Sequence, residues 1–317
     1  MINNQNIWQN YRRYYSTPSL TYQEKRLADV LLADYPGLYQ DSETGVVVWP
    51  GDPTSRICFI VHMDRIQVGK VDFIFEEGGS LPVIGGQLDN TICLACLRTL
   101  YDLGYKFNAI FTVQEEVCQA HKVVIDIARH YKWTIIDCDI DVFYKGDEWI
   151  DSISLRLGDN IARYTPWLVH MFWGMAEVAG INFSHKKDWL IGTVGFVRRD
   201  APDVDGLYLG LPILNYHSGH EFASLESVNA YTTFIGKVIE EFKDEREEDS
   251  PGDGNYRAGR FISRRIPFGA GVFCDRTGPA EECGEWAEYS PHSGQDKDCH
   301  RRHNRPGVRE CVGSPEV

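Results

Sequence analysis

The order of apolar and polar residues predicts strands and helices that alternate along residues 1–245. Continuous apolar runs at 57–61 and 109–113 are typical of strands buried on both faces of a sheet. Large apolar residues at helical spacing lie between these runs, as at Ile92, Leu97 and Leu100. Such alternation favours the α/β class, and we expect three layers, α/β/α, around a mostly parallel, mixed central sheet.

Local signals predict the remaining elements. Thr21 and Glu24 have the spacing of a capping box, which predicts the start of a helix. Pro166 opens another helix that Gly180 closes, and Ser224 precedes the last one. Apolar runs predict a hairpin at 73–76 and 81–84, and further strands at 133–136, 153–157, 189–197 and 207–214.

The composition changes near residue 246. Beyond it Glu, Asp, Arg, Gly, Pro and Ser dominate and aliphatic residues are sparse, so this segment cannot build a core. We therefore expect one folded domain at 1–245 and a polar tail at 246–317 that is largely disordered. Cys299, His300 and His303 in the tail match no zinc-finger spacing.

The charge of the chain narrows the range of its partners. The formal net charge is −14 and the pI is about 5.2, which opposes binding to nucleic-acid phosphates or anionic membranes.

The first residues have no signal-peptide pattern, and no apolar run is long enough to cross a bilayer. Nine cysteines at irregular spacings indicate reduced thiols. We expect a soluble, cytoplasmic protein without nucleic-acid or membrane partners.

Side chains that can bind metal ions follow the predicted strands. In an open α/β sheet the carboxyl ends of parallel strands share one edge, and ligands bind in the crevice there. Imidazole and carboxylate together suit zinc, with manganese or cobalt as alternatives. The residues are His62, Asp64, Glu115, Glu116, Asp137 and His217 at strand ends, and Asp89 at the start of a helix.

The adjacent acids Glu115 and Glu116 have two interpretations. Two acids directly after a buried strand are costly to desolvate unless a cation or a proton compensates them. One carboxylate can then act as a general base while its neighbour binds metal. Alternatively, the pair lies in a solvated loop and favours the N-terminus of the next helix. The convergence of five separate segments on one sheet edge favours the metal site.

Taken in order, these motifs resemble a known superfamily. His62-x-Asp64, Gly86-x-x-Asp89-Asn90, Glu115-Glu116-Val117, Ile136-Asp137 and Tyr216-His217-Ser218 are similar in order and interval to motifs of the zinc-dependent exopeptidase superfamily. The match is to its co-catalytic di-zinc aminopeptidases and covers residues 16–242. The resemblance implies that residues 1–245 form a di-zinc peptidase-like catalytic domain.

The resemblance implies a role for each matched residue. Asp89 bridges two metal ions, and Glu115 is the general base. Asp64 orients the His62 imidazole from two residues along the chain. The resemblance also implies a cis peptide between Asp89 and Asn90. The implied ligands that complete the two metal sites are His62 with Asp137 and Glu116 with His217.

Some features leave alternatives open. Asp139 and His220 are alternative ligands to Asp137 and His217, because each lies close to the matched motif. Related enzymes usually have Gly after Glu-Glu-Val, where this chain has Cys118. The intervals from His62 to Asp89 and from Asp137 to His217 are too short for the dimerisation insert and the lid of some relatives. A single domain without either is implied, and the oligomeric state stays open.

Three functions are compatible with this pattern. The leading interpretation is a metal-dependent aminopeptidase that removes N-terminal residues from peptides through a metal-bridging water, with Glu115 as the base. A second is an amidase or deacylase of N-acyl amino acids or related small amides. A third is a non-catalytic binding protein that retains the fold. It would be expected to have lost a ligand or the base, and the sequence retains them all.

Overall fold

The computed structural model describes residues 2–78, 82–117, 119–142, 152–156, 165–186 and 192–243. All of them belong to one unit of the chain, Met1–Ile266. The expected tail at 246–317 lies outside the described residues, so the prediction that it is largely disordered stays a prediction. Cys118 also lies outside them. No helix among the described residues is long and apolar enough to span a membrane.

The centre of this unit is an eight-stranded sheet with the order β1-β2-β6-β3-β7-β10-β8-β9. Neighbouring strands run parallel from β6 through β3 and β7 to β10, and antiparallel pairs lie at β1–β2, β2–β6 and β10–β8. The prediction of a mostly parallel, mixed sheet is confirmed. The strands are β1 (Tyr39–Gln40), β2 (Val47–Pro50), β3 (Ile57–His62), β6 (Asn108–Thr112), β7 (Thr134–Val142), β8 (Ser152–Arg156), β9 (Asn182–Lys186) and β10 (Gly206–Ile213).

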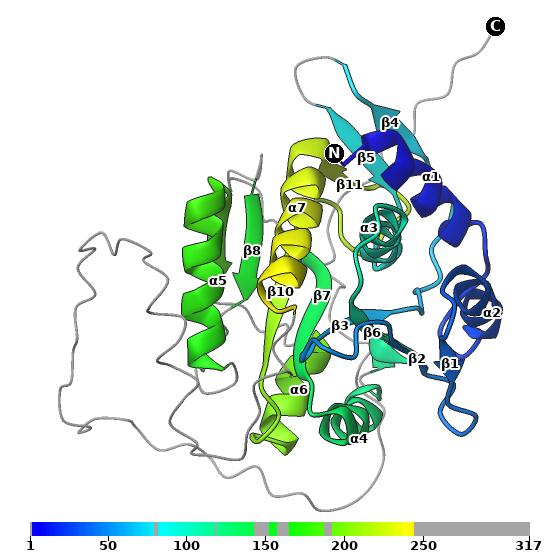
Figure 1. Ribbon diagram of the computed structural model, residues 1–317. Helices are drawn as coiled ribbons and strands as arrows, with labels where there is room; N and C mark the ends of the chain where they lie inside the picture. The colour runs from blue at the N-terminus through cyan, green and yellow to red at the C-terminus, as the bar shows by residue number, and fades with distance from the viewer. Residues whose placement is uncertain are drawn as a thin grey trace, which may run out of the picture. The chain divides into compact units, whose positions relative to one another are not determined.

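Helices cover both faces of the sheet. The helices α4 and α6 contact each other and lie on one face, whereas α3, α5 and α7 lie on the other, and α1 packs against α3 (Figure 1). The predicted three-layer α/β/α architecture is therefore confirmed. The helices are α1 (Asn4–Tyr15), α2 (Lys25–Asp34), α3 (Thr91–Asp102), α4 (His121–Tyr131), α5 (Pro166–Ala179), α6 (Gly192–Asp200) and α7 (Leu225–Glu241).

A second, three-stranded sheet has the antiparallel order β11-β5-β4. The strands β4 (Ile74–Glu76) and β5 (Val83–Gly86) are the predicted hairpin. The strand β11 (Glu221–Ser224) was not predicted, and it pairs with β5 so that Glu221 lies opposite Gly86. This pairing brings the segment after β5, which leads to Asp89, next to the segment that carries His217.

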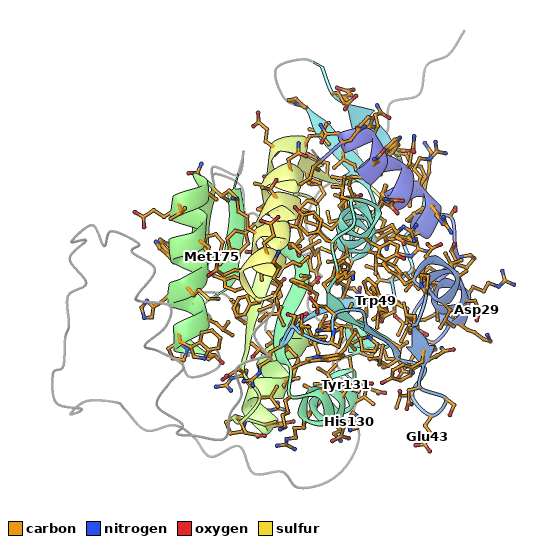
Figure 2. The ribbon with its side chains drawn as sticks, in the orientation of Figure 1. Asp29, Glu43, Trp49, His130, Tyr131 and Met175 are labelled. Atoms are coloured by element: carbon orange, nitrogen blue, oxygen red, sulfur yellow. The ribbon has the colours of Figure 1, made fainter. Side chains whose placement is uncertain are left out.

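Aromatic residues fill the core between the sheet and its N-terminal helices. Trp49 lies in the interior of the molecule (Figure 2) with its ring centroid 4.9 Å from that of Tyr35 and 4.8 Å from that of Phe107. Its indole N–H donates to the carbonyl of Pro36 over 3.2 Å. Each aromatic pair contributes ~0.5–1.5 kcal/mol beyond the area it buries. All six positions of β3 are buried, as its apolar run predicted.

Two local predictions are wrong. Thr21 and Glu24 do not form a capping box, because the Thr21 hydroxyl donates to Asp64 and the Glu24 carboxylate accepts from the backbone N–H groups of Tyr22 and Gln114. The range 192–197, predicted as part of a strand, belongs to α6. Its apolar residues Val194 and Val197 are buried on one face of this helix at a spacing of three.

Candidate metal centre

The register of the central sheet places the ends of β3 and β6 beside the middle of β7, which continues to Val142. His62, the last residue of β3, lies opposite Thr112 of β6, and Ile60 lies opposite Asp137 of β7. Since the strands are parallel, His62 is level with Asp139, two residues beyond Asp137. The turn after β6 continues into a short 3-10 helix at Glu115–Val117. Both acids of this turn therefore lie near the His62 imidazole.

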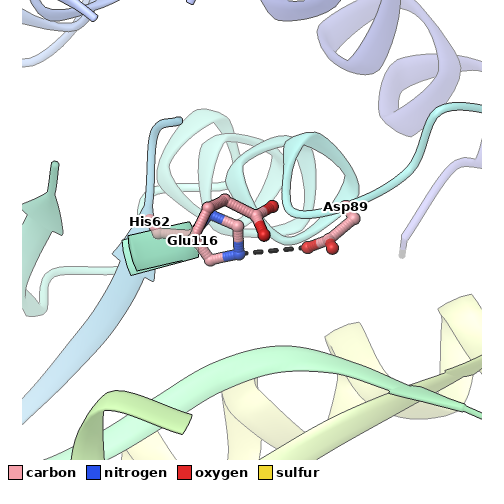
Figure 3. A group of neighbouring side chains, drawn as sticks. All are labelled: His62, Asp89 and Glu116. Atoms are coloured by element: carbon pink, nitrogen blue, oxygen red, sulfur yellow. Dashed lines mark hydrogen bonds and ion pairs between the residues drawn. The ribbon is translucent and has the colours of Figure 1, made fainter. Parts of the chain in front are cut away.

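Asp89 lies between two imidazoles. Its Oδ1 is 3.0 Å from His62 Nε2, and its Oδ2 is 3.2 Å from His217 Nε2. The carboxylate is buried at the turn before α3, next to a cis peptide bond between Asp89 and Asn90. Figure 3 shows the His62 ring directed at Asp89. Each oxygen of one carboxylate thus faces a different histidine.

Glu116 adds a carboxylate to the same cluster. Its Oε2 is 3.3 Å from His217 Nε2. Its Oε1 is buried and has no hydrogen-bond partner among the described residues. Ligand atoms of His62, Asp89 and Glu116 all lie within 4.8 Å of one another (Figure 3). A buried carboxylate oxygen without a partner costs free energy, and a cation in this cluster would remove that cost.

The two acids of β7 have different surroundings. Asp139 Oδ1 lies 3.5 Å from His62 Nε2. Asp137 Oδ2 instead accepts a hydrogen bond of 2.8 Å from the backbone N–H of Val194, in the first turn of α6. A Cβ atom on Gly192 would lie 2.7 Å from that oxygen, so the helix approaches Asp137 closely. The structure brings Asp139 to the histidine and engages Asp137 at a helix N-terminus, where a negative charge is stabilising.

The alternative ligand His220 lies at the surface. Its side chain is 61% exposed, and its Nδ1 is 3.3 Å from Asp72 Oδ2. His217 is 35% exposed and has both Asp89 and Glu116 as partners. Of the two histidines in this segment, the structure brings His217 to the cluster.

Asp64 connects the end of β3 to the Glu115 turn. Its buried carboxylate accepts hydrogen bonds from the backbone N–H groups of Glu115, at 3.0 Å, and Glu116, at 3.2 Å, and from the Thr21 hydroxyl. The backbone carbonyl of Asp64 lies 3.0 Å from His62 Nδ1. Donation from Nδ1 to this carbonyl leaves Nε2 with a free lone pair, which is the form that binds metal.

Burial and crowding of like charges shift the pKa values of these groups. Burial raises the pKa of Glu115 well above its usual range, His62 opposes the increase, and Asp139, Asp137 and Glu116 add to it. Burial also raises the pKa of Glu116. Burial lowers the pKa of His217, but hydrogen bonds to Asp89 and Glu116 outweigh this and raise it to about 10. The acids therefore attract positive charge to this edge of the sheet.

Glu221 belongs to the centre and was missed from the sequence. Its Oε2 accepts from the backbone N–H groups of Leu88, at 2.5 Å, and Asp89, at 3.0 Å. Burial raises its pKa to about 7, with the charge of Asp89 as a further cause. The signal in the sequence was weak, since it consists of one acid at the start of a four-residue strand.

No protein-family profile and no curated protein matches this sequence. Among solved structures, it is similar to the TET1 peptidase of Pyrococcus horikoshii, with a TM-score of 0.56 and 18% identity over 74% of this chain and 99% of that one. It is also similar to an aminopeptidase from the archaeon Desulfurococcus kamchatkensis, with a TM-score of 0.60 and 12% identity over 79% and 99% of the two chains. Aminopeptidase PepT from Bacillus cereus gives 0.56 and 13% over 76% and 99%.

The chain shares their fold. The resemblance to exopeptidases that the sequence motifs indicated is therefore confirmed at the level of the fold. Because this chain covers nearly the whole length of each of these proteins, the likeness extends over their entire fold. At 12–18% identity it does not decide the reaction, so the reaction has to be argued from the site.

Proposed function

We propose that this protein is a metal-dependent aminopeptidase whose centre is built around Asp89. The observation that carries the proposal is the Asp89 carboxylate with one oxygen facing His62 and the other facing His217. A carboxylate placed in this way can bridge two cations. A structural ion pair between one histidine and one acid would not explain why both oxygens of Asp89 face a histidine.

The donor set fits two divalent ions. Asp139 is paired with His62 and Glu116 is paired with His217, while one oxygen of Asp89 faces each histidine. We propose these five residues as the ligands, with Asp139 in the position first assigned to Asp137. Nitrogen and oxygen donors of this kind suit zinc, with cobalt or manganese as alternatives. The Glu116 Oε1, which has no hydrogen-bond partner in the part of the chain that the structure describes, supports the presence of a cation.

Two such ions would supply Lewis-acid polarisation of the scissile carbonyl and a water of lowered pKa. Glu115 has the remaining role. Among the described residues, the Glu115 carboxylate forms no ion pair with either His62 or His217. A carboxylate beside the proposed ions, but outside their ligand set, could take a proton from the attacking water and return it to the departing amine.

Asp64 would act by positioning. It fixes the backbone of Glu115 and Glu116 and the end of β3 at once. The general base and the ligands then keep a constant separation. Such fixed geometry is what makes proton transfer in a catalytic site efficient.

Peptides are the proposed substrates because the similar structures are named as aminopeptidases. Cleavage at the N-terminal residue follows if the centre receives a free α-amine. The irregularly spaced cysteines support a cytoplasmic location. We propose no nucleic-acid or membrane partner.

The test combines metal content with hydrolysis by the full-length protein. Aminoacyl anilides and their N-acylated analogues are compared as substrates, and we expect cleavage of the free-amine series. Glu115→Gln should retain the metal and lose ~10²–10⁴-fold in kcat. His121→Gln, which changes a histidine of α4 outside the proposed ligand set, is the matched control and should keep its activity.

Each other outcome identifies a different function. Preference for the N-acylated series would make the protein a deacylase. Bound metal without cleavage of either series would indicate a binding protein with a retained peptidase fold. Undiminished activity of Glu115→Gln would remove Glu115 from the role of base.

A further inference from the structure

One buried carboxylate holds together the two segments that carry Asp89 and His217. Glu221 is 1% exposed. Its Oε2 accepts from the backbone N–H groups of Leu88 and Asp89, and its Oε1 accepts from that of Ser218 over 3.3 Å. Asp89 and Ser218 are far apart in the sequence, and one side chain contacts the backbone of both.

The pairing of β11 with β5 explains how Glu221 reaches both segments. Glu221 is the first residue of β11 and lies opposite Gly86, the last residue of β5. The chain continues from Gly86 through Gln87 and Leu88 to Asp89. On the other strand it comes from His217 through a short turn. The side chain at this position of the small sheet therefore meets both segments where they approach each other.

The turn that carries His217 needs such support. His217 has φ = 57° and Asn215 has φ = 59°, which is the left-handed region that non-glycine residues rarely adopt. Such conformations persist where the surrounding structure fixes them. The Ser218 hydroxyl donates to the Asn215 carbonyl, and the Gly219 carbonyl accepts from the backbone N–H of Asp72. Glu221 adds the contact that ties this turn to Asp89.

We propose that Glu221 is a positioning residue that sets the distance between Asp89 and His217, and thereby forms the metal position on the His217 side. This inference rests on the proposed metal centre. A carboxylate has two oxygens that accept hydrogen bonds and no donor, so it serves three N–H groups in two segments. A glutamine has one accepting oxygen, and its NH₂ group would face an N–H donor of one segment.

The experiment measures metal binding rather than activity. Metal-free, full-length protein is titrated with Zn²⁺ by calorimetry, and with Co²⁺ followed by visible absorption, which reports the geometry of each site. In the wild type we expect two ions. In Glu221→Gln we expect the affinity for one ion to fall ~10–100-fold while the other ion binds as before. The Co²⁺ spectrum should change for the weakened ion alone.

A second variant and a matched control separate positioning from folding. Glu221→Asp keeps both oxygens but is one methylene shorter, so it should weaken the same ion. If Glu221→Gln does not fold, Glu221→Asp carries the test. Asp52→Asn is the control, because Asp52 is a buried acid that accepts the backbone N–H of Thr54 elsewhere in the molecule. It should leave both affinities unchanged.

The failures are distinguishable. A wild type that binds no ion would overturn the proposed function and the inference with it. A wild type that binds two ions, with both affinities retained in folded Glu221→Gln and Glu221→Asp, would overturn the inference alone. Equal loss of both ions would also contradict it, since that result indicates a general collapse of the site.

Discussion

Two groups of histidine and acid in this molecule differ in how their charges are balanced. At the ends of α4 and α6, His121 Nε2 lies 3.3 Å from Asp200 Oδ2. Asp200 also pairs with Arg199, and the His121 ring packs beside Phe196. A single acid there has a guanidinium and an imidazole as partners. Its charge is balanced without any added ion.

The cluster around Asp89 is balanced differently. It holds five carboxyl groups and two imidazoles, and in the described part of the chain every ion pair of these acids is with one of the two histidines. Two protonated imidazoles cannot neutralise five carboxylates, of which Asp64 and Asp89 are buried and the other three are partly buried. A histidine next to a single acid is therefore weak evidence for a metal site. A cluster in which carboxylates outnumber the cationic side chains is stronger evidence that cations bind there. The five acids are Asp64, Asp89, Glu115, Glu116 and Asp139.

The largest expected effect contrasts the two groups directly. His62→Ala removes a proposed ligand from the acidic cluster and should abolish binding of one ion. It should also lower kcat/KM by roughly 10³-fold, because an ion contributes several kcal/mol of charge stabilisation to the transition state. His121→Ala should leave two ions bound. Metal content after dialysis and initial rates provide the readouts. If both variants lost metal equally, the two groups would not differ as described.

The next effect compares two acids on one strand. Asp139→Asn should reduce metal affinity by ~10²-fold, since a neutral amide is a weaker ligand than a carboxylate. Asp137→Asn should keep both ions and lower the free energy of unfolding by about 1 kcal/mol, because it removes a negative charge from the N-terminus of α6. Metal titration and urea unfolding measure the two quantities. The reverse pattern would restore Asp137 as the ligand.

The smallest effect concerns a residue that touches no proposed ion. Asp64→Asn should weaken metal binding ~10–100-fold, the usual range for partners that orient a ligand. An amide oxygen cannot accept from both Glu115 and Glu116 N–H groups as the two carboxylate oxygens do. Calorimetric titration of the metal-free variant provides the measurement. Unchanged affinity would mean that the Glu115 turn holds its position without Asp64.

The helices and strands could be predicted where a local sequence signal, such as an apolar run or a helix-terminating glycine, determines them. The run at 57–61 is apolar throughout and became a fully buried strand, because only a central parallel strand buries both faces. Pro166 and Gly180 mark the two ends of α5, where Gly180 has φ = 65°. Residues 192–197 were misassigned because their apolar residues suggested a strand. The start of this helix depends on a tertiary contact, in which the Asp137 carboxylate accepts a hydrogen bond from the backbone N–H of Val194.

The site could be predicted only as a set of candidates. The sequence shows that acids and histidines follow strands, but the choice between Asp137 and Asp139 depends on which residue of β7 is level with His62. That register is a tertiary property. Glu221 was missed for a related reason, since its partners are backbone N–H groups of Leu88 and Asp89. No side-chain pattern in the sequence marks such an acceptor.

The most direct test of the central claim is anomalous diffraction from crystals of the full-length protein grown with zinc, recorded on both sides of the zinc absorption edge. We predict two anomalous peaks, one on each side of the Asp89 carboxylate. One peak should lie within coordination distance of His62 and Asp139, and the other within coordination distance of Glu116 and His217. The absence of peaks at Asp89, or zinc bound at the His121–Asp200 pair instead, would contradict the account.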